Sequence, residues 1–255
     1  MRTIDPSIYN DFYFREIEGH EDYYVFVKLK KIVETVFKEK VGRALDVGCG
    51  RGETLKMLTE KGWKCTGVDY SPAAIGRTKK NLAGLRVNLE VVSVPKIMYP
   101  DRTFDLVLFL NVWEHLNDSE IDQFFTHLGK FIKEDGVFII QTSPTRYQVR
   151  FGHFFLKLLG IRPASLDWHI NEQSFFSFSN KLKEFGFSGR VWMERMPKFW
   201  ASQVADKYFV LKKLARLFDF MIDSRVGRYL ADHFPLNLFF ATDLWAVVSL
   251  KEADN

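Results

Sequence analysis

The chain has 255 residues, of which 47% are hydrophobic and 27% charged; this composition supports a buried core and excludes disorder as the main description. Its 36 Lys and Arg against 32 Asp and Glu leave a net charge of +4, too small for the basic footprint of a nucleic-acid-binding domain. Two cysteines exclude a disulfide framework, and the polar opening stretch and short apolar runs predict a cytoplasmic protein that does not span a membrane.

Strand-like and helical stretches alternate along the first part of the chain. Residues 20–40 have the apolar spacing of a helix. Ser71 and Pro72 open a later helix as N-cap and first helical residue. Strands are predicted over residues 43–47, 64–68, 87–92, 104–110 and 136–142, with helices over residues 53–61, from 72 onward and over 118–132. Strand, helix and strand at this spacing indicate parallel pairing, with helices covering both faces of the sheet.

The second part of the chain is less regular. An aromatic and basic stretch over residues 145–168 is followed by a predicted helix over 174–185 and a strand over 188–194. The last strand, 243–250, follows a helical insertion over 200–233, so the sheet ends in an interrupted hairpin. We therefore expect an α/β, Rossmann-like fold with a seven-stranded, mostly parallel sheet whose last strand is antiparallel.

A glycine-rich turn follows the first predicted strand. Gly48, Gly50 and Gly52 remove side chains where a ligand would approach the backbone at the carboxyl ends of the strands. Asp69 ends the second strand, 21 residues after Gly48, where its carboxylate can accept hydrogen bonds from ribose hydroxyls. The two features together predict a nucleoside pocket. A nicotinamide or flavin oxidoreductase is the competing enzyme class, but the Gly-x-Gly-x-Gly spacing argues against it.

Three motifs in order carry a family resemblance: LDVGCGRG at 45–52, VDYSPAAI at 68–75 and PDRTFDLVLFLNVWEHL at 100–116. The sequence resembles the class I S-adenosylmethionine-dependent methyltransferases. The resemblance implies a methyltransferase domain over residues 43–255, with insertions at about 144–168 and 198–236, after an N-terminal helical cap over 1–42. It also implies cofactor contacts by Asp46, Gly48, Cys49, Gly50, Gly52, Asp69, Tyr70, Ser93, Val94 and Asn111.

Some of these contacts have specific implied roles. Asp46 and the glycines would border the methionine portion, Asp69 would hold the ribose and Tyr70 would flank the adenine. Ser93 stands where the family often has an acidic residue for the adenine amino group, and its hydroxyl can still accept that bond.

The NVWEHL stretch is similar to the Glu-His pair of the ubiquinone-biosynthesis-type O-methyltransferases. The resemblance implies catalytic roles for Glu114, His115 and the later His169, with an imidazole taking the proton of a hydroxyl acceptor. We expect methyl transfer to a small-molecule, sugar or lipid-linked acceptor, most readily at a hydroxyl oxygen. The alternatives are an N-methyltransferase acting on a small amine and a non-catalytic S-adenosylmethionine-binding protein, the latter supported only by Ser93 and Asn111.

A metal is not expected at this site. Some relatives hold a divalent ion with a Glu-x-x-Glu-His set and a later histidine, but Asn111 replaces the first glutamate here. An amide oxygen is a weaker ligand than a carboxylate. A site formed by Asn111, Glu114, His115 and His169 is therefore the less favoured alternative.

The two insertions combine apolar and basic residues. Residues 146–162 interleave Arg and Lys with Phe and Leu, and residues 207–222 repeat apolar residues at helical spacing among basic ones. Packing against the domain or in a homodimer is the simpler interpretation. The alternative is peripheral contact with an anionic membrane that presents a lipid-linked acceptor. Nucleic acid is not favoured as a substrate, because the fourth strand does not end in an Asn/Asp-Pro-Pro-aromatic run.

Overall fold

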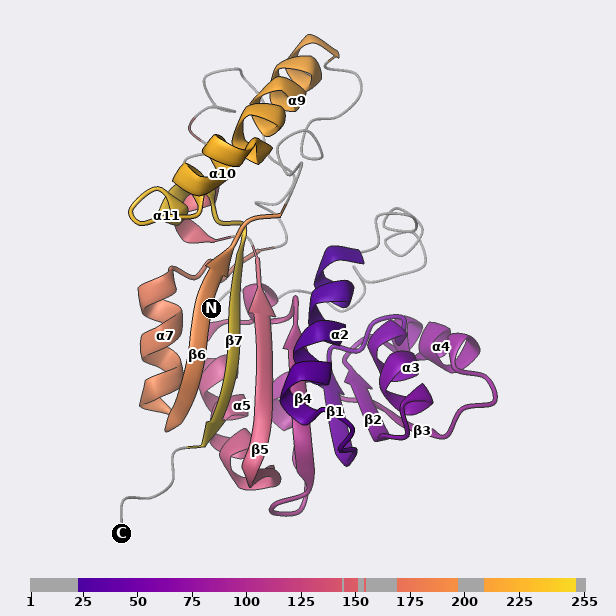
Figure 1. The fold of residues 1–255 in the computed structure, drawn as a ribbon. Helices are drawn as coiled ribbons and strands as arrows, with labels where there is room; N and C mark the ends of the chain where they lie inside the picture. Colours follow the sequence, from indigo (N-terminus) through magenta and orange to yellow (C-terminus); the bar gives the residue numbers. More distant parts are fainter. Residues whose placement is uncertain (1–22, 144, 151–153, 155–168, 197–208, 251–255) are drawn as a thin grey trace.

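The computed structural model describes residues 23–143, 145–150, 154, 169–196 and 209–250 (Figure 1). These residues form one seven-stranded sheet with the strand order β3-β2-β1-β4-β5-β7-β6. Strand β7 is antiparallel to both of its neighbours, β5 and β6, whereas the other pairs are parallel. The strands are β1 Arg43–Val47, β2 Lys64–Asp69, β3 Val87–Val91, β4 Phe104–Leu110, β5 Ile132–Thr142, β6 Phe187–Glu194 and β7 Asp243–Leu250. The predicted fold class is confirmed.

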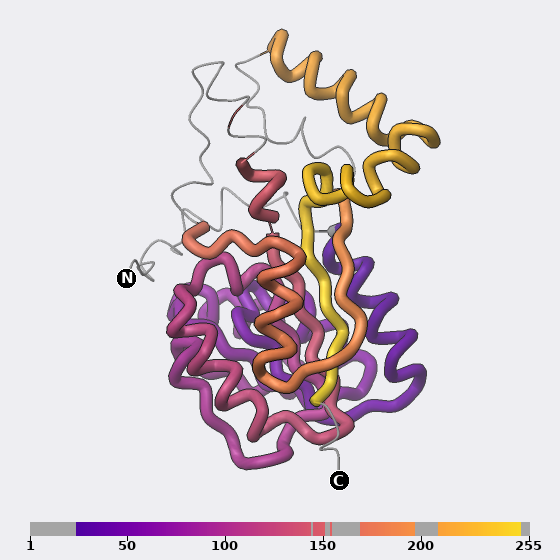
Figure 2. The backbone as a smooth tube through the Cα atoms, turned by 90° about the vertical axis from the view of Figure 1, so that its left-hand side faces the viewer, coloured from indigo at the N-terminus to yellow at the C-terminus, as the bar shows by residue number. Residues whose placement is uncertain are grey.

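Helices cover both faces of this sheet, and a helical insertion extends beyond the end of the sheet where β6 ends and β7 begins (Figures 1 and 2). The α-helices are α2 Tyr23–Phe37, α3 Glu53–Glu60, α4 Pro72–Asn81, α5 Asp118–Phe131, α7 Phe175–Glu184, α9 Phe209–Asp223, α10 Arg225–Ala231 and α11 Asn237–Phe240. Two short 3-10 helices are η2 Val94–Lys96 and η3 Trp113–His115. Four helices begin at a residue whose side chain caps the helix: Ser71 for α4, Asn117 for α5, Ser174 for α7 and Ser224 for α10.

Each face of the sheet has its own hydrophobic core. Helices α2, α3 and α4 pack on one face, where Leu29, Leu58 and Ile75 join Leu106 and Trp245 of the sheet. Helices α5 and α7 pack on the other, which is rich in phenylalanine. Its members include Phe104, Phe109, Phe124, Phe125, Phe131, Phe138, Phe178 and Phe187. Much of the high phenylalanine content is therefore core.

Helix α2 lies against the sheet as one of its covering layers. The Lys28 ammonium sits 5.4 Å from the Trp192 ring centroid and 5.7 Å from that of Trp245. Glu194, at the end of β6, accepts a hydrogen bond from Tyr24 and pairs with Lys28. The structure describes the predicted cap over residues 1–42 only from residue 23 onward. The helix in this part shares the hydrophobic core of the main domain.

The structure moves the start of one predicted strand and the end of one predicted insertion. Strand β5 begins at Ile132, before the expected residue 136, because Ile132 pairs with Phe104 of β4; after the charged run the pairing resumes, in a shifted register, at Val137 opposite Leu106. The insertion between β6 and β7 stays helical to Phe240, past the expected residue 236, since the short helix α11 leads directly into β7. Most of the predicted insertion at 144–168 lies outside the described residues, although residues 146–150 are helical.

The strand order predicts a ligand crevice at one end of the sheet. Strand β1 lies between β2 and β4, so the chain leaves β1 toward one side and later reaches β4 on the other. In open α/β sheets, ligands bind outside the carboxyl ends of the strands at such a switch point. The carboxyl ends of β1, β2 and β4 hold Val47, Asp69 and Leu110, next to the glycine turn and the NVWEHL stretch.

Candidate active site

The glycine turn leaves β1 in a conformation that favours glycine. Gly48, Gly50 and Gly52 have φ values of +75°, +52° and +86°. A Cβ on Gly48 would lie 2.4 Å from Val112 Cγ2, and one on Gly52 would lie 2.7 Å from Thr78 Cγ2, so these two glycines allow close packing. A Cβ on Gly50 would meet nothing within 4 Å. The middle glycine therefore borders open space, where the cofactor is predicted to lie against the backbone.

Hydrogen bonds from the neighbouring strand and helix hold this turn. The backbone N–H groups of Gly48 and Cys49 both donate to the Val68 carbonyl, at 2.8 and 3.0 Å. The hydroxyl of Thr78 in α4 donates to the Gly50 carbonyl at 2.6 Å. Sequence reasoning missed Thr78, because a threonine inside a helix carries no signal that it supports a distant turn.

Asp69 also contacts the turn through its carboxylate. Its Oδ2 accepts a hydrogen bond from the Gly50 N–H at 3.1 Å, and its Oδ1 accepts one from the Ser71 N–H at 2.9 Å. Burial raises the pKa of Asp69, while the N–H groups of Ser71 and Gly50 act in the opposite direction. A carboxylate anchored at this strand end can still accept bonds from ribose hydroxyls, since each oxygen has a second lone pair.

Asp46, within β1, is a second buried carboxyl group beside the turn. Burial, together with the charges of Asp69 and Glu53, raises its pKa to about 7. Unlike Asp69, its side chain accepts no hydrogen bond from the residues that the structure describes. A bound sulfonium and its ammonium group would supply the positive charge that favours ionised Asp46. Both aspartates thus fit a cationic nucleoside.

Cofactor affinity should consequently depend on pH. If S-adenosylmethionine binds ionised Asp46, whose pKa is raised to about 7, the dissociation constant should rise about ten-fold when the pH falls from 8 to 6. Calorimetric titration at several pH values measures this. Asp46→Asn is the control, because the neutral side chain leaves only the titration of the ligand itself. An equal pH dependence in both proteins would contradict the role of Asp46.

The other predicted cofactor contacts lie around the same strand ends. Tyr70 directly follows β2 and is partly exposed, while Ser93 and the buried Val94 follow β3 at the start of η2. The Ser93 hydroxyl makes no cap bond to η2, which leaves it suited to the adenine edge. Cys49 is buried, and burial raises the pKa of its thiol, so it is a packing residue and not a nucleophile.

Asn111 directly follows β4 and has a backbone conformation that is uncommon outside glycine, with φ at +53°. Its N–H donates to the backbone and side-chain oxygens of Gln141, both at 3.1 Å. Its side-chain oxygen accepts a hydrogen bond from the Ser143 hydroxyl at 3.3 Å. Asn111 therefore shapes the edge of the crevice, and its contact with the cofactor stays a prediction.

The structure brings together the three residues predicted to be catalytic. Glu114, His115 and His169 each offer a ligand atom, and these atoms all lie within 4.8 Å of one another. The ring centroids of His115 and His169 are 5.3 Å apart. The Glu114 carbonyl joins the two segments by accepting hydrogen bonds from the N–H groups of Ile170 and Asn171, at 2.8 and 3.1 Å.

Glu114 is buried close to the two imidazoles. It is 2% exposed, and its Oε2 accepts a hydrogen bond from the Thr142 hydroxyl at 2.7 Å. Burial raises the pKa of Glu114 to about 8. A buried carboxyl group in this environment is suited to positioning the two histidines and is poorly placed to contact an acceptor. The catalytic role predicted for Glu114 stays a prediction.

Burial, followed by the charge of His115, lowers the pKa of His169 to about 4. Its Nδ1 is buried and has no hydrogen-bond partner among the residues that the structure describes. This imidazole is therefore neutral at physiological pH, with a ring nitrogen able to bind a polar group of a ligand.

A buried polar network behind the site was not predicted from the sequence. Gln141 donates to Asp243 Oδ1 at 2.7 Å, and Thr242 donates to the other carboxylate oxygen. Asn171 donates to the Leu116 carbonyl and to Asp118 Oδ1, both at 3.0 Å. These contacts hold the end of β5 against the start of β7, and they hold the segment around His169 against the start of α5. They join residues far apart in sequence, so no local sequence pattern indicates them.

A family model described as a methyltransferase domain matches residues 21–190, well over half of the chain. The chain belongs to this methyltransferase family. Its fold and motifs make it a class I S-adenosylmethionine-dependent methyltransferase, and the nicotinamide or flavin alternative is wrong. The aspartates and the open Gly50 fit that cofactor.

Named relatives agree with this assignment over part of the chain. A ubiquinone biosynthesis O-methyltransferase of Rhizobium leguminosarum bv. trifolii is 32% identical over 102 residues, which are 39% of this chain and 40% of the relative. That of Pelagibacter ubique is 28% identical over 130 residues, 46% of this chain and 52% of the relative. The chain thus matches about half or less of these relatives' length.

A solved structure extends the likeness of fold to nearly the whole chain. The S-adenosylmethionine-dependent methyltransferase of Archaeoglobus fulgidus has a TM-score of 0.60 and 18% identity, covering 94% of this chain and 100% of that one.

Proposed function

We propose that this methyltransferase transfers the methyl group of S-adenosylmethionine to a hydroxyl oxygen of a small-molecule, sugar or lipid-linked acceptor. The observation that carries the proposal is the pair of imidazoles, His115 and His169, 5.3 Å apart beside the crevice. The O-methyltransferases named among the relatives support the same acceptor chemistry.

The sulfonium of the cofactor supplies an electrophilic methyl group, so the protein needs chiefly to align the acceptor and remove its proton. During transfer, the acceptor oxygen forms a bond to the methyl carbon as the carbon–sulfur bond breaks, and the acceptor proton passes to an imidazole. Burial and the His115 charge lower the pKa of His169 to about 4, so His169 stays neutral and orients the hydroxyl. We assign the proton to His115, because only one ring of so close a pair is readily charged.

Acceptor panels in matched pairs test this function. The purified protein is incubated with methyl-labelled S-adenosylmethionine and pairs that differ only in one group, such as a phenol against the corresponding aniline, or a sugar against its amino sugar. We expect label in the hydroxyl member of at least one pair. Transfer only to amines would support the N-methyltransferase alternative and overturn the oxygen assignment.

A divalent metal is not part of this proposal, although Glu114, His115 and His169 lie close enough to hold one. Glu114 is buried and bound to Thr142, and its pKa is raised to about 8, so an ion would have to displace its proton at neutral pH. We expect turnover to stay within about two-fold after treatment with EDTA. Loss of turnover restored by Mg²⁺ or Zn²⁺, together with a rise in melting temperature on adding that ion, would contradict this prediction.

A further inference from the structure

Helix α9 has a line of exposed apolar side chains on its outer face. Val210, Leu214, Leu217 and Met221 recur at intervals of four, three and four residues, which places them along one side of the helix. They are 72%, 57%, 57% and 60% exposed. We call these four residues the outer stripe.

The inner face of α9 satisfies the packing needs of this helix. Leu211, Phe218 and Ile222 are partly buried on the adjacent side of the helix, and Asp219 is buried. The Phe218 ring packs on that of Phe240 in α11, with centroids 6.2 Å apart. A surface helix needs one apolar face to pack on its own domain, and the inner face of α9 does this. The outer stripe is therefore an additional apolar surface that packing within the domain does not use.

Apolar exposure continues beyond α9. Val226, Tyr229 and Leu230 of α10 are 70%, 65% and 51% exposed, and Phe234 just after it is 72% exposed. A hollow of about 400 Å³ beside them is lined by two arginines and by Tyr229, Asp232 and His233. The arginines are Arg225 and Arg228.

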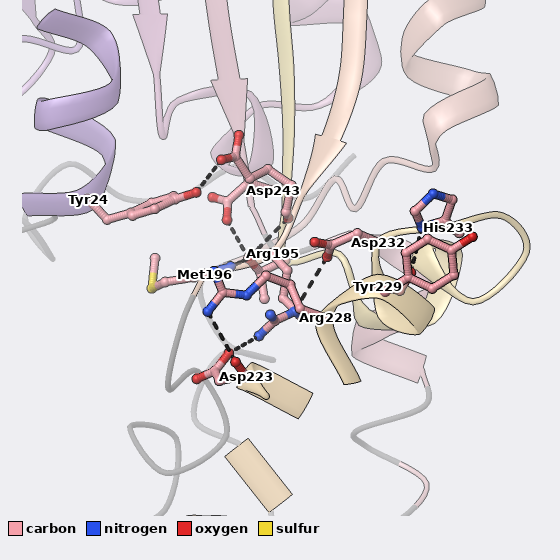
Figure 3. A network of polar contacts seen from close by, with 11 residues as sticks. Tyr24, Arg195, Met196, Asp223, Arg228, Tyr229, Asp232, His233 and Asp243 are labelled. Carbon is pink, nitrogen blue, oxygen red and sulfur yellow. Dashed lines mark hydrogen bonds and ion pairs between the residues drawn. The ribbon is translucent and has the colours of Figure 1, made fainter. Parts of the chain in front are cut away.

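The charges of this insertion are arranged unequally. Its acidic groups turn toward the domain: Asp223 and Asp232 both pair with Arg195, which follows β6 (Figure 3). Four of its basic residues are exposed: Lys213, Arg216, Arg225 and Arg228. Asp232 lines the hollow together with the two arginines but pairs with Arg195, so the exposed charge beside the outer stripe is mainly positive.

We propose that the outer stripe and the arginine-lined hollow dock on the surface of a bilayer that contains anionic phospholipid. Exposed apolar area combined with cationic side chains is what interfacial helices use, and the hollow offers Arg225 and Arg228 to a headgroup phosphate. In the described part of the chain, no helix is both long and apolar enough to cross a bilayer. A second copy fits less well, because a two-fold interface would bring the same cations together.

The insertion lies at the same end of the molecule as the candidate active site. Helices α9–α11 connect the end of β6 to the start of β7, at the same end of the sheet as the carboxyl ends of the parallel strands (Figures 1 and 2). Docking therefore brings the crevice near the bilayer surface, where a lipid-linked hydroxyl would be available. This last step rests on the proposed function, whereas membrane binding does not.

Vesicle flotation tests the docking. We expect the full chain to float with vesicles of phosphatidylcholine and phosphatidylglycerol, to float less as salt rises, and to bind pure phosphatidylcholine at least ten-fold more weakly. Leu217→Gln/Met221→Gln and Lys213→Gln/Arg216→Gln should each weaken binding about ten-fold or more. The labelled-methyl assay with soluble acceptors should be unchanged in both variants.

Matched substitutions elsewhere serve as controls. Met98→Gln removes a methionine that is 71% exposed, and Lys79→Gln/Lys80→Gln removes two exposed charges from α4. Both controls should bind as the unaltered chain does. Absence of binding at low salt would overturn the proposal, as would a concentration-dependent dimer that is lost in Leu217→Gln/Met221→Gln without any vesicle binding.

Discussion

Replacing Asp69 by alanine is expected to weaken S-adenosylmethionine binding about 100-fold, equivalent to about 3 kcal/mol. The variant removes the charged acceptor predicted for the ribose hydroxyls. It also releases the Gly50 N–H, which Asp69 now holds at 3.1 Å, so the turn that should lie against the cofactor loses a restraint. Isothermal titration of the purified variant measures the change.

The control for this variant is Asp105→Ala. Asp105 lies near the start of β4, at the opposite end of the sheet, where it pairs with Lys133 at 2.6 Å. We expect its cofactor affinity to stay within about two-fold, since a partly exposed ion pair contributes little and lies far from the crevice. Unchanged affinity in a folded Asp69→Ala protein, checked by circular dichroism, would remove Asp69 from the predicted pocket.

Asp69 illustrates what the sequence made predictable. The end of a buried strand is visible as the point where an apolar run meets a polar residue, and parallel strands place such ends at one edge. Asp69 and Asn111 could therefore be assigned to a common crevice from their positions alone. The Ser71 cap was equally local, and its hydroxyl accepts the Ala74 N–H at 3.2 Å as predicted.

Features that depend on contacts between distant segments were beyond such reasoning. The grouping of His115 with His169 was expected only from the family resemblance, because it depends on the Glu114 carbonyl accepting two N–H groups from the later segment. The burial of Glu114 and its hydrogen bond from Thr142 likewise join η3 to the end of β5, which are far apart in sequence. The start of β5 at Ile132 was missed for a related reason, because Ile132 pairs with Phe104 of β4 although the charged run that follows it resembles a turn.

Substitution of His115 by alanine is expected to lower turnover about 100-fold or more while cofactor affinity stays within a few-fold. Removing the group that takes the acceptor proton affects the transition state, whereas S-adenosylmethionine is held by the glycine turn and the aspartates. Steady-state kinetics with the hydroxyl acceptor identified from the panel, together with calorimetry for the cofactor, separate the two effects.

His127→Ala is the matched control, because His127 lies on α5 and outside the site. The turnover of this variant should match that of the unaltered enzyme.

The pH profile distinguishes a base from a structural residue. In the unaltered enzyme, kcat should fall as protonation of His115 removes the base at low pH, and His115→Ala should lose that dependence. His169→Ala should instead raise the KM for the acceptor, since its neutral ring is proposed to orient the hydroxyl without taking its proton. A His115→Ala enzyme that loses cofactor affinity but keeps its turnover at saturation would show that His115 supports the pocket and is not the base.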